Sequence, residues 1–355
     1  MLLYITVCVF PYCMICSFLS LFQTWGEFRK HNLVQLLTAC VPLAGSVILL
    51  VITNRLEADW FICLFISVYT VLTISVCIET LKWTWSTNVA PILDKSNLDT
   101  WKTGLAICVG SYIHVLIHSL DKQIVKMAFD VESFARYSFA LSLQSIVTVF
   151  ITALSQPLYH FLSNGHIGKK DYIVLMRILM MLGALGGMAY YVCSFVVSWI
   201  LPDYQQSLDI IEIYFMTFPA IAVINCLYIN LYKLYRMRKK YVIRLITVLV
   251  FSALMNILLI NWRWELTSVT LATAMVYYVW LLAEARTFRE VGFSLRDGLF
   301  LMGYFCVYVS SLYVPGAIMS AVVYFAALFV LCLLVYNREM IFAMMYLIKR
   351  KHKSR

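Results

Sequence analysis

Residues 60–78 read WFICLFISVYTVLTISVCI, a run that contains no charged side chain. A helix rises about 1.5 Å per residue, so about 20 apolar residues cross the roughly 30 Å hydrocarbon core of a bilayer. A run of this length and composition predicts a membrane-spanning helix. The period-2 alternation of a membrane β-barrel is absent from it.

Similar runs recur along the whole chain. Of its 355 residues, 63% are apolar and 13% are charged, whereas a soluble domain has about 45–50% apolar and about 25% charged residues. This composition excludes a soluble globular protein, a disordered chain and a secreted disulfide scaffold. The expected fold is an all-α polytopic transmembrane bundle of eleven spans, at about 1–22, 33–54, 60–80, 101–120, 133–161, 173–201, 209–232, 242–261, 266–283, 297–313 and 317–336.

The basic residues predict the orientation. If the loop after the first span is cytoplasmic, 23 of the 28 Lys and Arg residues lie inside and five lie outside. Cytoplasmic loops carry an excess of these residues. We therefore expect a protein of the cytoplasmic membrane with its N-terminus outside and its C-terminus in the cytoplasm. At the cytoplasmic surface, Met340 to Ile348 and the basic residues that follow would form an interfacial anchor. The net charge of +10 thus indicates basic loops and no nucleic-acid partner.

Three consecutive spans recur with similar flanking residues on either side of a polar segment. Phe28-Arg29-Lys30-His31 stands between the first and second spans of one set, and Met237-Arg238-Lys239-Lys240 stands between the first and second spans of the other. Parallel repeats of this kind occur in transporters. We interpret the repeat as two lobes, of which the first lacks about three N-terminal spans. The expected parts are the second half of the first lobe (1–82), a cytoplasmic linker (83–100), the second lobe (101–290), two extra spans (291–336) and a basic cytoplasmic tail (337–355).

One segment carries a family resemblance. Residues 120–163 read LDKQIVKMAFDVESFARYSFALSLQSIVTVFITALSQPLYHFLS. With the loop FQTWGEFRK at 22–30, this segment resembles the Wzx-type oligosaccharide flippases of the multidrug/oligosaccharidyl-lipid/polysaccharide (MOP) exporter superfamily. The second lobe of that family opens with a helix that ends in an Asp. A short outer loop and a small-aromatic pattern follow, here Ala135 to Ala140, and the next helix closes near a Pro, here Pro157. The chain departs from the family in its span count and in having no Gly near Ala135.

The resemblance implies transport without a cofactor, and no enzyme. Such flippases translocate an undecaprenyl-diphosphate-linked oligosaccharide by alternating access, for O-antigen or capsule biosynthesis at the inner membrane. The implied partners are this lipid, the membrane lipids, a polysaccharide polymerase and a chain-length regulator. One alternative is an integral-membrane polysaccharide polymerase or glycosyltransferase, which needs a substantial outer loop with carboxylates or Arg. Another is a cation-coupled multidrug exporter, which needs acidic residues deep in the first lobe.

Ionisable residues inside a span are costly, and they are therefore candidates for function. His114 and His118 lie one helical turn apart on one face, and Asp121 and Lys122 follow them. The pair predicts a polar stripe that lines a cavity and contacts a diphosphate or senses protons. A polar contact between helices and a metal pair are the alternatives, although no third metal ligand stands nearby.

Three further side chains complete the candidate site. Arg136 would hold phosphate at the outer mouth of the cavity or anchor its helix at the interface. Gln144, deeper on the same helix, would bond sugar hydroxyls or a neighbouring helix. Arg177 would meet the incoming diphosphate or reach the cytoplasmic headgroups. The predicted substrate-binding residues are His114, His118, Asp121, Lys122, Arg136, Gln144 and Arg177, with no metal site.

Two pairs outside this set are also noted. Asp209 and Glu212 open the seventh span, as part of an outer gate or as interfacial charge. Gly183 and Gly187 form a GxxxG that predicts close helix packing or a hinge.

Overall fold

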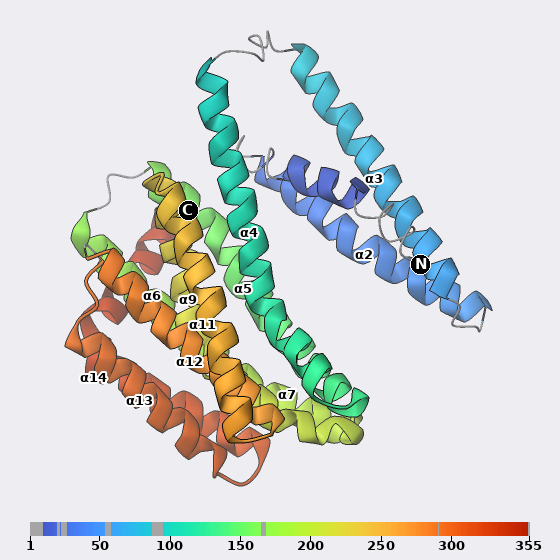
Figure 1. The fold of residues 1–355 in the computed structure, drawn as a ribbon. Coiled ribbons are helices and arrows are strands. Elements are labelled where there is room, and N and C mark those ends of the chain that lie inside the picture. Colours follow the sequence, from blue (N-terminus) through green and yellow to red (C-terminus); the bar gives the residue numbers. More distant parts are fainter. Residues whose placement is uncertain are drawn as a thin grey trace. The chain divides into compact units, whose positions relative to one another are not determined.

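The computed structural model describes residues 10–19, 22, 27–53, 58–86, 95–164, 168–289 and 291–353, and these form helices and short connections without strands (Figure 1). The chain divides into two compact units, Met1–Asn97 and Leu98–Arg355. The predicted linker 83–100 contains this boundary, and 87–94 within it lie outside the described residues. Its role as a linker stays a prediction.

The first unit contains the helix Phe10–Leu19, α2 (Phe28–Thr53) and α3 (Ala58–Ser86). A small apolar core joins these helices, and Lys30 of α2 forms an ion pair with Glu79 of α3 at 3.0 Å between Nζ and Oε1. The run 60–78 lies in α3. Val76 is the one fully buried side chain of this run, and the others are exposed or partly exposed on the unit, as a lipid-facing helix requires.

The second unit is a bundle of helices that follows the chain from α4 onward (Figure 1). The short helices η1 and η2 are a 3₁₀ helix and a π-helix. The elements are α4 (Lys95–Ala128), α5 (Val131–Asn164), α6 (Lys169–Gly186), α7 (Ala189–Ile200), η1 (Pro202–Ser207), α8 (Leu208–Phe215), α9 (Phe218–Val223), η2 (Ile224–Tyr228), α10 (Ile229–Leu234), α11 (Arg238–Trp262), α12 (Leu266–Thr287), α13 (Leu295–Leu312) and α14 (Ala317–Lys353).

Polarity in this bundle is inverted relative to a soluble protein. On α11, Ser252 and Asn256 are buried, whereas Leu254 is 60% exposed. A surface helix of a soluble protein turns its apolar face inward instead. Among the described residues, six helices are long and apolar enough to cross a membrane, and a bent pair makes a seventh. The chain is therefore a helical, multi-pass membrane protein. The count of eleven spans and the two-lobe repeat stay predictions.

Two of the predicted spans are not continuous helices. The window 173–201 is interrupted at Gly187 and Met188, between α6 and α7. The window 209–232 consists of α8, α9, η2 and α10, with a bend of 51° between Pro202–Phe215 and Phe218–Leu234. Pro219 stands in the first turn of α9 and lacks the N–H that a continuous helix needs. The Thr217 hydroxyl donates to the Tyr214 carbonyl at 2.6 Å, which satisfies this oxygen at the bend.

Glycine lets α6 approach the broken helix closely. A Cβ at Gly183 would lie 2.5 Å from the Phe218 carbonyl oxygen and 2.6 Å from Pro219 Cα. A Cβ at Gly187 would lie 2.7 Å from the Tyr324 hydroxyl. Both glycines of the GxxxG therefore stand where a side chain would collide with another element, and the break after α6 lies at the second one.

The last helix bends before the tail. In α14 the backbone at Tyr336 leaves the helical region, at φ −122° and ψ 34°, and a second helical stretch continues to Lys353. The predicted tail 337–355 is thus helical up to Lys353, and residues 354–355 lie outside the described ones. Its position at a membrane surface stays a prediction.

Candidate functional site

The polar face of α4 meets α12. The Tyr277 hydroxyl lies 2.9 Å from His118 Nδ1, and the Thr273 hydroxyl donates to Asp121 Oδ2 at 2.5 Å. The rings of His114 and Trp280 are 5.9 Å apart. Residue numbers rise on α4 as they fall on α12, so the two helices run antiparallel. We call this line of contacts the α4–α12 seam: His114, His118, Asp121, Thr273, Tyr277, Trp280 and Glu284.

One end of the seam is a buried carboxylate held by neutral groups. Asp121 is 1% exposed. In addition to Thr273, the Tyr214 hydroxyl donates to it at 2.9 Å and the Asn256 amide at 3.3 Å. The Tyr137 hydroxyl lies 2.7 Å from that of Tyr214, which extends the network to α5. Within the described residues no Lys or Arg pairs with Asp121, so hydrogen bonds alone offset the cost of burying its charge.

The other end of the seam is a buried ion pair. Glu284 is also 1% exposed, and Arg244 Nε of α11 lies 3.2 Å from its Oε1. The Trp280 indole donates to Oε1 at 2.9 Å and the Tyr232 hydroxyl donates to Oε2 at 2.7 Å. Arg244 also donates to the Thr287 hydroxyl at 2.7 Å. Here the charge of the carboxylate is matched by a guanidinium.

Between the two ends lie the polar atoms of two neighbouring side chains. His114 Nε2 and Asn225 Oδ1 are buried, and within the described part of the chain these side chains interact with each other and have no well-formed hydrogen bond to a third group at these two atoms. Asn225 is the polar neighbour of His114, and Lys233 lies near enough for its charge to act on the ring. Asn225 belongs to the π-helix η2. Short π segments often mark functional sites, and buried polar atoms nearly always have partners. We therefore take this His114–Asn225 pair as the candidate position for contact with a ligand.

The other predicted residues lie in different surroundings. Gln144 is buried on α5, and Lys122 is partly buried next to Asp121. Arg136 forms an ion pair with Glu132 at 2.5 Å and lines a separate cleft near the start of α5. Of the seven predicted residues, the structure therefore brings His114, His118 and Asp121 into the seam.

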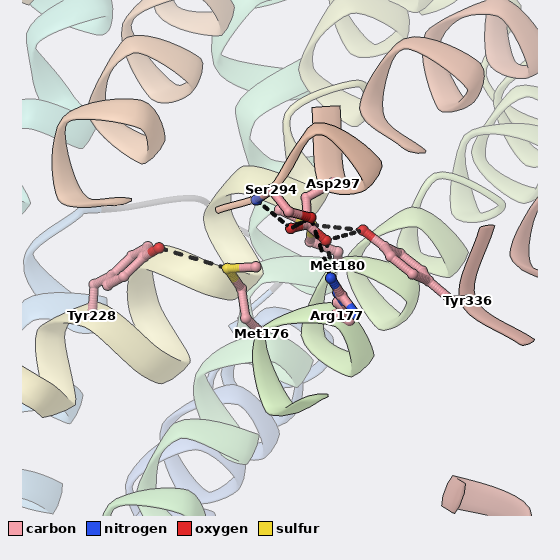
Figure 2. Close-up of polar contacts among 7 residues, drawn as sticks. All are labelled: Met176, Arg177, Met180, Tyr228, Ser294, Asp297 and Tyr336. Atoms are coloured by element: carbon pink, nitrogen blue, oxygen red, sulfur yellow. Dashed lines mark hydrogen bonds and ion pairs between the residues drawn. The ribbon is translucent and has the colours of Figure 1, made fainter. Parts of the chain in front are cut away.

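Arg177 joins three helices (Figure 2). Its Nε donates to Asp297 Oδ1 at 2.9 Å, and its Nη2 donates to the Ser294 hydroxyl at 3.2 Å. The Ser294 N–H and the Tyr336 hydroxyl also donate to Asp297, at 2.7 and 2.8 Å. We call Arg177, Ser294, Asp297 and Tyr336 the Asp297 cluster. The guanidinium faces a protein carboxylate, and the predicted contact of Arg177 with a diphosphate or headgroup stays a prediction.

Sequence reasoning does not single out several residues of the site. Asn225, Arg244, Tyr277 and Glu284 come from segments that are far from α4 in sequence. Asn225 is a polar residue inside an apolar window, and this signal could have identified it. Tyr277 gives no such signal because tyrosines are common in the apolar runs of this chain. Among the described residues, no three His, Cys, Asp or Glu side chains come together as a metal site.

No known protein family and no curated protein matches this chain.

Proposed function

We propose that this protein is a flippase that moves an undecaprenyl-diphosphate-linked oligosaccharide across the cytoplasmic membrane for surface polysaccharide biosynthesis. The proposal includes eleven spans in two lobes, with the N-terminus outside and the C-terminus inside. The observation that carries it is the His114–Asn225 pair, a buried polar position between α4 and a broken helix. Discontinuous helices form the substrate sites of many secondary transporters near the middle of the membrane.

The charges around this pair suit a diphosphate head group. Lys233 acts on His114 from the end of α10, and Arg244 lies at the same end of the seam. A phosphate oxygen accepts hydrogen bonds from an imidazole N–H and from guanidinium or ammonium groups. An entering diphosphate would compete with Glu284 for Arg244, so substrate binding would weaken the ion pair at that end of the seam.

The opposite end favours a change of conformation. The contacts of Asp121 with Tyr214, Thr273 and Asn256 involve neutral donors and a charged acceptor, each with a net contribution of about 1.5–3 kcal/mol. Of these three, only the Thr273 contact joins α4 to α12, so separating the two helices at this end costs less than breaking a buried ion pair, for which about 3–5 kcal/mol is typical. In the proposed cycle, this end of the seam opens to release the saccharide.

Transport measurements test the proposal. We expect the full chain to restore surface polysaccharide in a strain that lacks its own flippase. It should also move a fluorescent lipid-diphosphate oligosaccharide in proteoliposomes. His114→Ala and Asn225→Ala should reduce the rate at least tenfold without loss of folded protein. Asn261→Ala is the matched control because Asn261 is exposed at the end of α11. No transport by the wild-type protein, or unchanged rates in both the His114→Ala and the Asn225→Ala variant, would contradict the proposal.

A further inference from the structure

A second candidate site lies in the same unit, apart from the seam. A cleft of about 380 Å³ opens between the start of α5, the segment of η1 and α8, and the connection from α11 to α12. Its polar lining includes Arg136, Gln206, Asp209 and Glu265. In the proposed topology, all three segments lie at the outer face of the cytoplasmic membrane.

One wall of the cleft is aromatic. Trp264 is 62% exposed, and its ring lies 5.4 Å from that of Phe129. Both rings line the cleft. An exposed indole beside a second ring offers an apolar face for stacking and an N–H for hydrogen bonding. A sugar ring suits such a wall because one of its faces carries C–H groups and its edges carry hydroxyls.

The arginines at the cleft are already paired with carboxylates. Arg136 is paired with Glu132 at 2.5 Å, and Arg263 is paired with Glu265 at 3.1 Å. The Thr267 hydroxyl occupies the second oxygen of Glu265 at 3.2 Å. Among the described residues that line the cleft, a diphosphate would therefore find no unpaired cation, and it would be repelled by Asp209 and Glu265.

Hydrogen-bonding capacity remains for an uncharged ligand. Within the described residues the Asp209 carboxylate has no hydrogen bond or ion pair, and it can accept from two hydroxyls. Gln206 offers an amide that both donates and accepts. Apolar walls with a few convergent polar groups are typical of small-molecule sites.

We infer that this cleft binds a neutral saccharide, through stacking on Trp264 and hydrogen bonds to Gln206 and Asp209. The identity of this saccharide with the head of the transported lipid, and the membrane face at which it binds, rest on the proposed function. Binding itself does not depend on transport. The cleft is thus a saccharide subsite separate from the His114–Asn225 pair, where the diphosphate would bind.

Binding to the purified full-length protein in detergent tests the inference. The probes are an array of soluble neutral oligosaccharides and, as an anion, inorganic pyrophosphate. We expect at least one oligosaccharide to bind, with Trp264→Ala and Gln206→Ala each weakening it at least tenfold. Trp262→Ala is the matched control, because Trp262 is 80% exposed but does not line the cleft. Pyrophosphate should not compete. If Trp264→Ala fails to fold, Asp209→Ala takes its place, because the Asp209 carboxylate is another of the proposed contacts.

Three results would overturn the inference: no oligosaccharide binds, binding is unchanged in the cleft variants, or pyrophosphate displaces the saccharide. The lipid-linked form serves as a separate arm, in which the same Trp264 dependence is expected. If the wild-type protein binds saccharide through Trp264 but moves no lipid, the proposed flippase function is refuted and the inferred saccharide site is not. A protein that transports but shows no Trp264-dependent binding would refute the cleft alone.

Discussion

Asp121 and Asp297 are two fully buried aspartates in one helical unit, and different kinds of partner offset the cost of burying their charges. Asp297 faces the Arg177 guanidinium and also accepts from Ser294 and Tyr336. Asp121 accepts hydrogen bonds from two hydroxyls and an amide, all of which are neutral. A carboxylate matched by a cation is fixed in place, because separating the pair leaves two buried charges. A carboxylate held by neutral donors exchanges its partners at lower cost.

The packing of the helices that carry the two regions differs in the same direction. On α6, which carries Arg177, Gly183 lies six residues further along, and Gly187 follows the end of the helix; both stand close to neighbouring elements. Along the seam, long histidine, tyrosine and tryptophan side chains bridge α4 and α12. We therefore expect the Asp297 cluster to stabilise the fold and the α4–α12 seam to move during transport.

The largest expected effect comes from breaking the ion pair of the Asp297 cluster. Arg177→Met leaves Asp297 buried without its cation and should lower the free energy of unfolding by about 3–5 kcal/mol. Thermal or denaturant unfolding in detergent measures this change. Arg296→Met, at an exposed position on the same stretch of α13, should change stability by less than about 0.5 kcal/mol. The double variant Arg177→Met/Asp297→Asn should be more stable than Arg177→Met. Equal stability of Arg177→Met and Arg296→Met would show that the Arg177–Asp297 ion pair has no structural role.

The next largest effect tests the close packing of α6. Gly183→Ala forces a methyl group against the backbone of Phe218 and Pro219 and should cost about 1–3 kcal/mol. Gly298→Ala is the control, since its nearest contact would be the Phe293 ring at 3.9 Å. Ala also favours the helix there, by about 1 kcal/mol. If both variants unfold alike, α6 does not depend on this contact.

A smaller effect on stability, with a large effect on transport, is expected at the seam. Asp121→Asn removes a buried charge but keeps an acceptor for Tyr214 or Thr273. The free energy of unfolding should therefore change by no more than about 1 kcal/mol. Transport in proteoliposomes should fall at least tenfold. A loss of stability as large as that of Arg177→Met would show that the two aspartates have the same structural role, and the comparison would fail.

The smallest effect is expected at the cap of α5, outside both regions. Asp130 accepts the Ser133 N–H at 3.1 Å, and hydrogen bonds from the Ser133 hydroxyl and N–H lower the pKa of Asp130 below its ordinary value of 3.8. This contribution to stability is present above pH 3.8 and is lost as the pH falls through the lowered pKa. Asp130→Ala should therefore lower the Tm slightly at neutral pH, and its difference from the wild-type protein should shrink in acid. A difference that is constant with pH would exclude the capping carboxylate as its cause.

The positions of the helices could be predicted from sequence because charge-free runs of about 20 residues specify them directly. Each window from 33–54 to 317–336 coincides with described helices. The bend of 51° and the π-helix η2 could not be predicted in this way, since the hydropathy of 209–232 is that of any span. Pro219 and Asn225 were the local signs of irregularity in it.

The site was predictable on one helix only. The spacing of His114, His118 and Asp121 places them on one face of α4, but nothing local identifies the helix that this face contacts. Tyr277 and Thr273 lie in a run that resembles ordinary apolar packing, more than 150 positions further along the chain. For Arg177, a basic residue close to a span end, the sequence offers two partners: a diphosphate or the cytoplasmic headgroups. The partner in the structure, the Asp297 carboxylate of α13, depends on tertiary structure.

The π-helix η2 also sets the rotation of α10, the helix that comes directly after it. A helix turns about 100° per residue, so the extra residue of one wide turn rotates the rest of the segment by about that angle. Downstream of this offset, Asn230 donates to Ser155 of α5 at 2.9 Å, and Lys233 lies within electrostatic reach of His114. Removing one residue from Ile224–Tyr228 would restore the α-helical register and turn both side chains away from these neighbours. The single inserted residue of η2 thus fixes the rotation of α10 and directs Lys233, at the basic end of the broken helix, toward His114 of α4.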